Sequence, residues 1–261
     1  MKRGAAIVLA LVAFLAAFGG SASAITHGTA DGNGHPNVGA LIAEWREPGQ
    51  KDLLCSGTLI SPTVFLTASH CTIFLESLEI SDVWVTFDGQ FDGSSTLRHG
   101  VYHTNPAYGH DFAHLNDVAV VVLDSPVAGT TPAQLPQAGL LDQMAVKNGL
   151  KGQKFTAVGY GDQERQNGGG PPSFPFDAMR RVATSEFRAI NTNWLRLSQN
   201  PSTGDGGTCF GDSGGPNFLG SSNVLAAVTV TGDSVCRATN VVFRLDTPAS
   251  RDFLGDYVTL P

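Results

Sequence analysis

Residues 209–216 read Cys-Phe-Gly-Asp-Ser-Gly-Gly-Pro, and the rest of the chain can be interpreted around this stretch. Ser213 stands among glycines, with an acid directly before it and a cysteine four residues upstream. Glycines this dense cost backbone entropy, so they indicate unusual torsions or close packing. A hydroxyl on such a turn can act as a nucleophile beside free N–H groups that bind an anion. Most Gly/Asp/Ser clusters are plain surface turns, and the octapeptide alone leaves both interpretations open.

Composition and the first residues indicate an exported, folded chain. At 261 residues it can bury a sizeable core as one large all-β domain or two smaller ones. Residues 1–24 have the pattern of a signal peptide: Lys2 and Arg3, an uncharged apolar run, and Ala-Ser-Ala at 22–24. The apolar run is short for a membrane span, so cleavage is favoured over an uncleaved anchor. We expect a secreted, extracellular protein with no membrane in its mature form.

The net charge excludes one class of binding partner, and the cysteine content predicts disulfides. Removing Lys2 and Arg3 from 16 basic residues leaves 14 against 23 acidic ones, a net charge of −9. Nucleic acid is not expected as a partner, because phosphate binding requires a basic face. Four cysteines in an exported chain predict two disulfides, with three connectivities open. Their spacing does not fit a zinc site. The cysteines are Cys55, Cys71, Cys209 and Cys236.

Short apolar runs separated by turns favour an all-β fold. Residues 125–152 are rich in Pro, Ala and Gly and form the best linker between two halves, and 167–172 predict a mobile surface loop. One short helix is expected within 248–258, with Ser250 as its N-cap. The expected strands are 38–45, 53–60, 64–67, 83–87, 115–123, 155–161, 194–198, 224–231 and 241–245.

The histidines between positions 99 and 114 could form a metal site or belong to an ordinary surface loop. His99 with His103, and His110 with His114, have the spacing that places two imidazoles on one helix face and could bind a metal. Pro106 would break such a helix. We therefore expect histidines of a surface loop and no metal site.

A base and an acid precede Ser213 in the chain. His70 lies in Thr-Ala-Ser-His-Cys, beside a cysteine expected to be held by a disulfide, and Asp117 stands at the entrance of a buried strand, where a carboxylate needs a partner. Taken singly, a structural histidine and a strand-capping acid are the ordinary alternatives. Together they give the order His, Asp, Ser, a known triad order. The G-x-S-x-G elbow of α/β-hydrolases is excluded, because all seven histidines lie at or before position 114.

In these motifs the chain resembles the chymotrypsin-like (trypsin-like) serine proteases over essentially its whole mature length. The resemblance is carried by residues 67–71, 116–119 and 211–216, and segments 25–28 and 103–108 are similar to the family as well. It implies two six-stranded antiparallel β-barrels with the active site in the cleft between them. It also implies a sequential pairing of the cysteines, Cys55–Cys71 and Cys209–Cys236.

The resemblance implies one peptidase domain made of an N-terminal barrel at 25–138 and a C-terminal barrel at 139–261. The expected function is a secreted serine endopeptidase that forms an acyl-enzyme. Ser213 would attack the peptide carbonyl, His70 would transfer the proton, and Asp117 would orient the imidazole. The oxyanion hole would consist of the backbone N–H groups of Gly211 and Ser213.

The family activates itself when a free N-terminal amine inserts beside the acid that precedes the nucleophile. In this chain Asp212 is that acid, and cleavage after residue 24 would itself create the Ile25 amine. We expect no separate zymogen peptide and no cofactor. The segment after His70 has no convincing calcium-loop pattern of acids.

The base of the primary pocket is expected at Gly207, six residues before Ser213, and Asp205 is two positions away from it. Because no acid lies at the base of the primary pocket, we expect the substrate to have an uncharged side chain at the cleaved position. Residues 230–232 read Val-Thr-Gly where the family often has Ser-Trp-Gly, which leaves the shape of the pocket open. The other residues expected to line it are Thr208, Val230, Thr231, Gly232 and Asn240.

Polypeptide substrates and protein protease inhibitors are the expected partners, and we expect a monomer. Two further functions fit the same residues. The first is a catalytically inactive homologue that uses the fold as a binding module, since fold alone does not guarantee activity. The second is a secreted hydrolase of esters, which shares the triad chemistry. All three triad residue types are present, which favours the enzyme.

Overall fold

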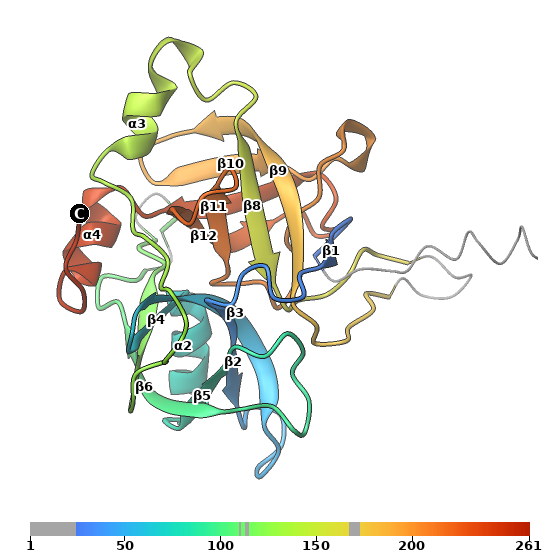
Figure 1. Cartoon of the computed structure of the whole chain (residues 1–261), viewed down its shortest axis with the longest axis vertical. Coiled ribbons are helices and arrows are strands. Elements are labelled where there is room, and N and C mark those ends of the chain that lie inside the picture. The colour runs from blue at the N-terminus through green and yellow to red at the C-terminus, as the bar shows by residue number, and fades with distance from the viewer. Residues whose placement is uncertain (1–24, 110, 113–114, 167–172) are drawn as a thin grey trace, which may run out of the picture.

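The computed structural model describes residues 25–109, 111–112, 115–166 and 173–261. Across these residues the chain forms two closed six-stranded antiparallel β-barrels, one in each half (Figure 1). The all-β prediction is therefore confirmed. The predicted signal peptide at 1–24, the predicted loop at 167–172, and His110 and His114 lie outside the described residues.

The first barrel has the strand order β2-β3-β4-β7-β6-β5 and closes through the pairing of β2 with β5. Its strands are rich in β-branched and aromatic residues, as in Val-Phe-Leu-Thr of β4 and Ala-Val-Val-Val-Leu of β7. The predicted hairpin of β3 and β4 is present. The strands are β2 (Val38–Ala43), β3 (Asp52–Ser61), β4 (Val64–Thr67), β5 (Val83–Thr86), β6 (Arg98–Thr104) and β7 (Ala119–Leu123).

The second barrel follows a connection through residues 124–153. Its ring runs β8-β9-β10-β13-β12-β11, and the pairing of β8 with β9 closes it. The short β1 (Thr29–Ala30), from before the first barrel, pairs with β9. The ring strands are β8 (Lys154–Gly159), β9 (Arg181–Ile190), β10 (Trp194–Ser198), β11 (Pro216–Leu219), β12 (Leu225–Gly232) and β13 (Thr239–Arg244).

The helices correct two sequence predictions. The terminal helix is present as α4 (Pro248–Leu254), but its N-cap is Thr247. The hydroxyl of Ser250 instead donates to the carbonyl of Arg244, inside the helix. Helix α2 (Ser69–Ser77), which carries His70, was not predicted. Within the described part the other helical segments are α3 (Leu140–Ala145) and the 3₁₀ turns η2 (Val146–Asn148) and η3 (Pro201–Thr203).

The prediction of loop histidines is wrong for His99 and His103, which lie on strand β6. Residues four apart on a strand share a face but are about 13 Å apart, so they cannot bind one ion together. His99 Nδ1 is 2.7 Å from Asp124 Oδ2, and the His103 ring packs 5.3 Å from that of Tyr257, which follows α4.

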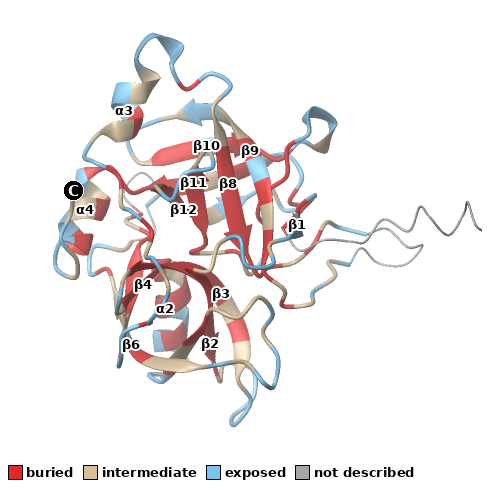
Figure 2. Ribbon diagram, in the orientation of Figure 1, coloured by how far each residue is buried: buried red, intermediate tan, exposed pale blue. Residues whose placement is uncertain are grey.

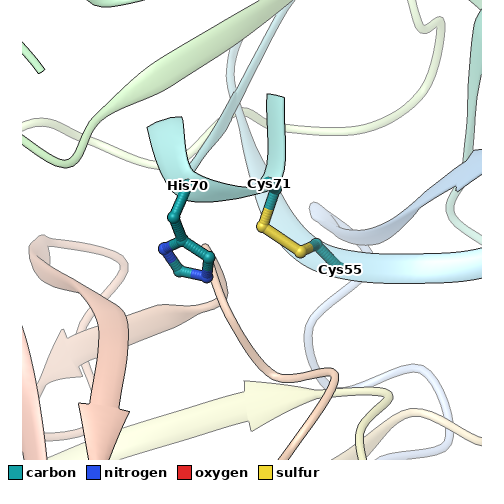
Figure 3. Close-up of side chains that lie close together, drawn as sticks. All are labelled: Cys55, His70 and Cys71. Atoms are coloured by element: carbon teal, nitrogen blue, oxygen red, sulfur yellow. A yellow bond between two sulfur atoms is a disulfide. The ribbon is translucent and has the colours of Figure 1, made fainter. Parts of the chain in front are cut away.

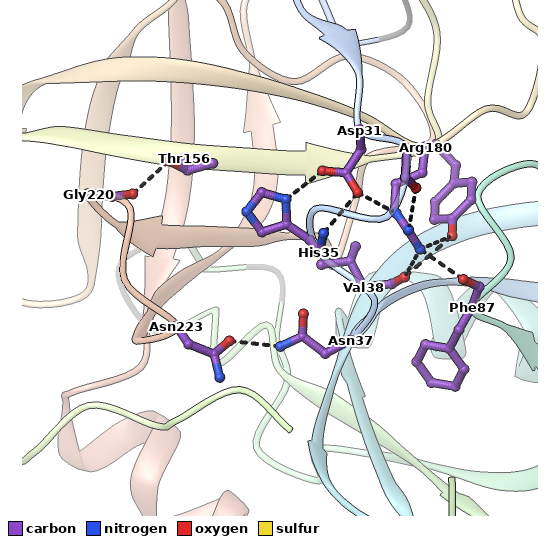
Figure 4. Close-up of polar contacts among 11 residues, drawn as sticks. Asp31, His35, Asn37, Val38, Phe87, Thr156, Arg180, Gly220 and Asn223 are labelled. Carbon is purple, nitrogen blue, oxygen red and sulfur yellow. Dashed lines mark hydrogen bonds and ion pairs between the residues drawn. The ribbon is translucent and has the colours of Figure 1, made fainter. Parts of the chain in front are cut away.

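Buried residues gather inside both barrels and along the seam between them (Figure 2). Arg180 is 1% exposed and connects the two halves of the chain through buried hydrogen bonds. Its guanidinium is 2.9 Å from Asp31 and also donates to the carbonyls of Val38 and Phe87 in the first half and to the hydroxyl of Tyr160 (Figure 4). A buried cation with this many acceptors holds the two barrels, and hence the residues between them, in fixed positions.

Candidate active site

His70 and Asp117 meet at the start of α2. Asp117 is fully buried just before β7, and its Oδ1 accepts a 2.8 Å hydrogen bond from the backbone N–H of His70. Its Oδ2 lies 2.7 Å from His70 Nδ1. Because a carboxylate only accepts, Nδ1 carries the proton and Nε2 is left as the free acceptor. The hydroxyl of Ser69, which donates to the Val118 carbonyl at 2.7 Å, fixes the helix to the strand entrance.

A disulfide holds the other side of His70. Cys71 is bonded to Cys55 on β3, as the resemblance implied (Figure 3). The two sulfurs and a ring nitrogen of His70 lie within 4.8 Å of one another, a geometry that could suit a metal. Disulfide sulfurs are not thiolates, so this group has no metal-binding chemistry. The second disulfide joins Cys209 to Cys236.

The loop that carries Ser213 packs on the segment that carries His70. Gly214 has a φ of 76°, and a side chain there would overlap Thr67 Oγ1 and the backbone nitrogen of Ala68. The Ser213 carbonyl accepts a 2.9 Å hydrogen bond from the backbone N–H of Ser56, next to Cys55. The glycine is thus required by the close approach of the two segments, which places the Ser213 loop against the segment that leads into His70. In the part of the chain described, Ser213 Oγ and His70 are not hydrogen-bonded; such contacts tighten on substrate binding.

Two free donors lie beside Ser213. Among the described residues, the backbone N–H groups of Gly211 and Ser213 donate to no protein acceptor. The carbonyl of Phe210 accepts from Asp162 N–H at 2.7 Å. In a trans peptide the N–H points opposite to the carbonyl, so Gly211 N–H is directed away from Asp162. Gly211 has a φ of 91°, which a side chain would strain. Unpaired backbone N–H groups of this kind are the donors that an oxyanion hole uses.

Asp212 is a fully buried carboxylate without a cationic partner among the described residues. Burial raises its pKa to about 7, against hydrogen bonds from the backbone N–H groups of Cys209 and Gly161, both 2.8 Å long. Ile25 is also fully buried, and its neighbour Thr26 pairs with Gly207 through hydrogen bonds of 2.8 and 3.0 Å. The uncut chain has an amide at residue 25, so the proposed ion pair is not formed there.

A cavity of about 120 Å³ opens beside Ser213, lined by residues 208–210, 213, 229–234 and 236. The predicted residues Thr208, Val230, Thr231 and Gly232 line it. Gly207 and Asn240 do not: both are buried, and Asn240 Oδ1 accepts a 2.8 Å hydrogen bond from the Thr208 hydroxyl.

The acids near this cavity are occupied by other contacts. Asp205 is buried and lies 2.6 Å from Lys154 Nζ. Burial opposes its ionisation, but hydrogen bonds led by that of Lys154 outweigh it and lower the pKa of Asp205. Asp233 lines the cavity and accepts backbone N–H groups of residues 237–239. Its carboxylate is therefore engaged with the loop, so no acid among the residues that line the cavity is free to bind a basic side chain.

Ser56 is a positioning residue that sequence reasoning missed. Its hydroxyl donates to the Gly211 carbonyl at 3.0 Å and accepts from Tyr160 N–H at 3.1 Å, so it links the serine loop to the end of β8. Only its place next to Cys55 could have drawn attention to it.

Comparisons with known proteins show the family of the chain. The trypsin family model matches residues 30–250. Glucanase inhibitor protein 1 of Phytophthora sojae is 30% identical over 232 residues, which is 83% of this chain and 81% of that protein. The solved structure of HL collagenase aligns with a TM-score of 0.65 at 20% identity, over 89% of this chain and 97% of the other. The chain belongs to the trypsin family of serine proteases.

Removing the Cys55–Cys71 disulfide by replacing both cysteines with alanine is expected to destabilise the protein and loosen His70. The two cysteines are 16 residues apart, and closing a loop of this size is worth about 3 kcal/mol. Urea unfolding measures the loss, and kcat on any cleaved peptide reports the misorientation of the imidazole. Removal of Cys209–Cys236 is the matched control, which should raise KM more than it lowers kcat. Equal kinetic effects of both removals would contradict the separate roles.

Proposed function

We propose that the protein is a secreted serine endopeptidase that hydrolyses peptide bonds with the triad Ser213, His70 and Asp117. The main support is the buried Asp117 carboxylate, which lies 2.7 Å from His70 Nδ1. The Ser213 loop packs on the segment that leads into His70. Polypeptides are the proposed substrates, with uncharged residues at the cleaved position. The chain is expected to be exported as a monomer. No helix in the described ranges is long and apolar enough to span a membrane.

In the proposed reaction Ser213 Oγ bonds to the peptide carbonyl carbon while its proton passes to His70 Nε2. The carbonyl oxygen becomes an anion that accepts from the N–H groups of Gly211 and Ser213. The C–N bond then breaks, and His70 returns the proton to the leaving amine. Water attacks the acyl-enzyme by the same route and restores Ser213. Asp117 holds the imidazole in position and stabilises its protonated form.

Covalent labelling with a fluorophosphonate tests this proposal. The protein starting at Ile25 should be labelled, and Ser213→Ala should not. Comparing turnover of a peptide and the matching ester then separates a peptidase from a pure esterase. A folded protein that resists labelling would overturn the enzymatic proposal.

A binding module is the second candidate, favoured by one observation. The relative from Phytophthora sojae is named as an inhibitor of a glucanase. A protein of this fold can therefore serve as a binding partner, and this chain could do the same with its cleft or its outer surface. A folded, unlabelled protein that captures a glucanase would support this alternative.

We further propose that removal of residues 1–24 activates the enzyme. The Ile25 amine would supply the cation that the buried Asp212 lacks. Support comes from the burial of both residues and from the pairing of Thr26 with Gly207. A well-formed buried ion pair would order the turn of Gly211 and Asp212. N-terminal sequencing of active secreted protein should give Ile25, and an active form with any other first residue would overturn this proposal.

The pH dependence of stability gives a separate test. The folded pKa of Asp212 is about 7 against 3.8 unfolded, so the contribution of Asp212 to the stability of the uncut chain is largest below pH 4 and is lost as pH rises to 7. The loss is about 4 kcal/mol, from a shift of about three pKa units. We expect urea unfolding to show it for a chain extended by Ser23 and Ala24, but not for one starting at Ile25. Asp212→Asn should flatten the profile of the extended chain and inactivate the shorter one; identical profiles for both wild-type chains would contradict the pair.

A further inference from the structure

A buried side chain, Gln199, lies behind Thr208, one of the residues that line the cavity beside Ser213. Gln199 directly follows β10 and is 1% exposed. A Cβ atom at Gly207 would lie 2.5 Å from Gln199 Cγ and 2.6 Å from its Nε2. The amide of Gln199 therefore fills the volume that a side chain at residue 207 would occupy.

Hydrogen bonds fix the orientation of this amide. Gln199 Nε2 donates to the Thr208 carbonyl at 2.9 Å, and the backbone N–H of Gln199 donates to the Ala238 carbonyl at 3.0 Å. Since Thr208 O can only accept, the nitrogen of the amide must face it. Gln199 Oε1 has no partner among the described residues. The Gln199 side chain is thus held in one orientation, against the Thr208 carbonyl.

The layer formed by Gly207 and Thr208, which contacts Gln199, is held in place by hydrogen bonds. Gly207 is paired through both its N–H and its carbonyl with Thr26. The Thr208 hydroxyl is bonded to Asn240, whose Nδ2 donates to Asn217 Oδ1 at 3.1 Å. Each contact is buried, so shifting the layer would break several hydrogen bonds at once.

The size and charge of the cavity then limit what it can hold. Its volume of about 120 Å³ is smaller than the ~150 Å³ cavity that accommodates one benzene ring. Its one carboxylate, from Asp233, is already bonded to backbone N–H groups. This volume favours small side chains over a phenyl ring, and a Lys or Arg side chain would find no free counter-charge among the residues that line the cavity.

On the basis of the proposed peptidase function, we propose that Gln199 is the residue that sets substrate specificity. It shortens the primary pocket so that the protein cleaves after small uncharged residues: alanine, serine, threonine and valine. Phenylalanine, leucine, lysine and arginine are excluded. The residue acts through Thr208 and Gly207 rather than by touching the scissile bond.

Tetrapeptide anilides that differ only at the cleaved residue test the proposal with the chain starting at Ile25. Wild type should favour alanine and valine over phenylalanine and arginine. Gln199→Ala should raise kcat/KM for leucine relative to alanine about 10-fold or more, because pocket volume discriminates by this amount. Gln199→Met keeps most of the volume and should retain the small-residue preference, which separates volume from hydrogen bonding. The fluorophosphonate labelling rate, which does not depend on the pocket, checks that each variant is folded.

The outcomes separate two failures. Wild type that is labelled but prefers arginine, lysine or phenylalanine overturns the role of Gln199 alone. A labelled Gln199→Ala variant that keeps the wild-type preference overturns that role as well. Wild type that is folded, unlabelled and inactive on all anilides overturns the proposed peptidase function, and with it the role of Gln199 in specificity.

Discussion

Ser213→Ala should lower kcat on a cleaved peptide by about 10⁶-fold, the loss typical when a triad nucleophile is removed. The variant lacks the oxygen that bonds to the carbonyl carbon, so no acyl-enzyme can form. The N–H groups of Gly211 and Ser213 remain, and they should leave a residual rate about 10³-fold above water. KM should change little, because the hydroxyl contributes little to ground-state binding. Steady-state kinetics with a chromogenic peptide measures both constants.

Ser202→Ala is the matched control for this substitution. Ser202 is exposed in η3 and lies outside both the triad and the residues that line the cavity. Its loss should leave kcat within a few-fold of wild type. If both variants retained activity, the nucleophile would be another group and the assignment of Ser213 would be wrong.

Asp117→Asn should lower kcat by about 10⁴-fold at neutral pH with the fold intact. An Asn side chain presents an NH₂ group as well as an oxygen. If the NH₂ faces His70 Nδ1, that nitrogen must accept and the proton moves to Nε2, which can then no longer take the proton of Ser213. The rate of fluorophosphonate labelling should fall in parallel with kcat, since both depend on the same proton transfer.

Asp124→Asn provides a geometric control for this prediction. Asp124 Oδ2 is also 2.7 Å from a histidine Nδ1, that of His99, but the pair lies on the exposed end of strands β6 and β7. Its removal should not change kcat. A similar loss in both variants would indicate a general effect of charge rather than orientation of His70.

The triad candidates could be found from sequence because each sits in a short, distinctive motif. His70 precedes a cysteine, Asp117 precedes a run of valines, and Ser213 lies among glycines. Most strands could be found for a similar reason, since apolar runs bounded by turns mark them locally. The buried Asp117 contact with His70 was expected from the cost of an unpaired carboxylate, and the structure has it.

Other features were missed because they depend on contacts between distant residues. Helix α2 buries Cys71 and Leu75, but Ile73 and Phe74 beside them are exposed apolar residues, which blurs the helical pattern. Strand β6 has the sequence Arg-His-Gly-Val-Tyr-His-Thr, with no apolar alternation.

Gln199 and Arg180 carry no local signal at all. Arg180 bonds to Asp31, 149 residues away, and Gln199 is defined by the volume under Gly207. Sequence motifs identify the candidate catalytic residues. Residues such as Arg180 and Gln199, which pack between the barrels or behind the cavity wall, can be identified only from the three-dimensional structure. Burial of these two residues is also unusual, because arginine and glutamine side chains are rarely fully buried.

The most direct measurement is the mass of the enzyme during turnover of an activated acetyl ester. The chain starting at Ile25 is mixed with p-nitrophenyl acetate, quenched in acid, and analysed as intact protein and as peptides. We predict a burst of nitrophenol and one acetyl group on Ser213 that is lost on return to neutral pH. Nitrophenol release with no acetyl group on Ser213, or with the acetyl group on another residue, would contradict the proposed triad.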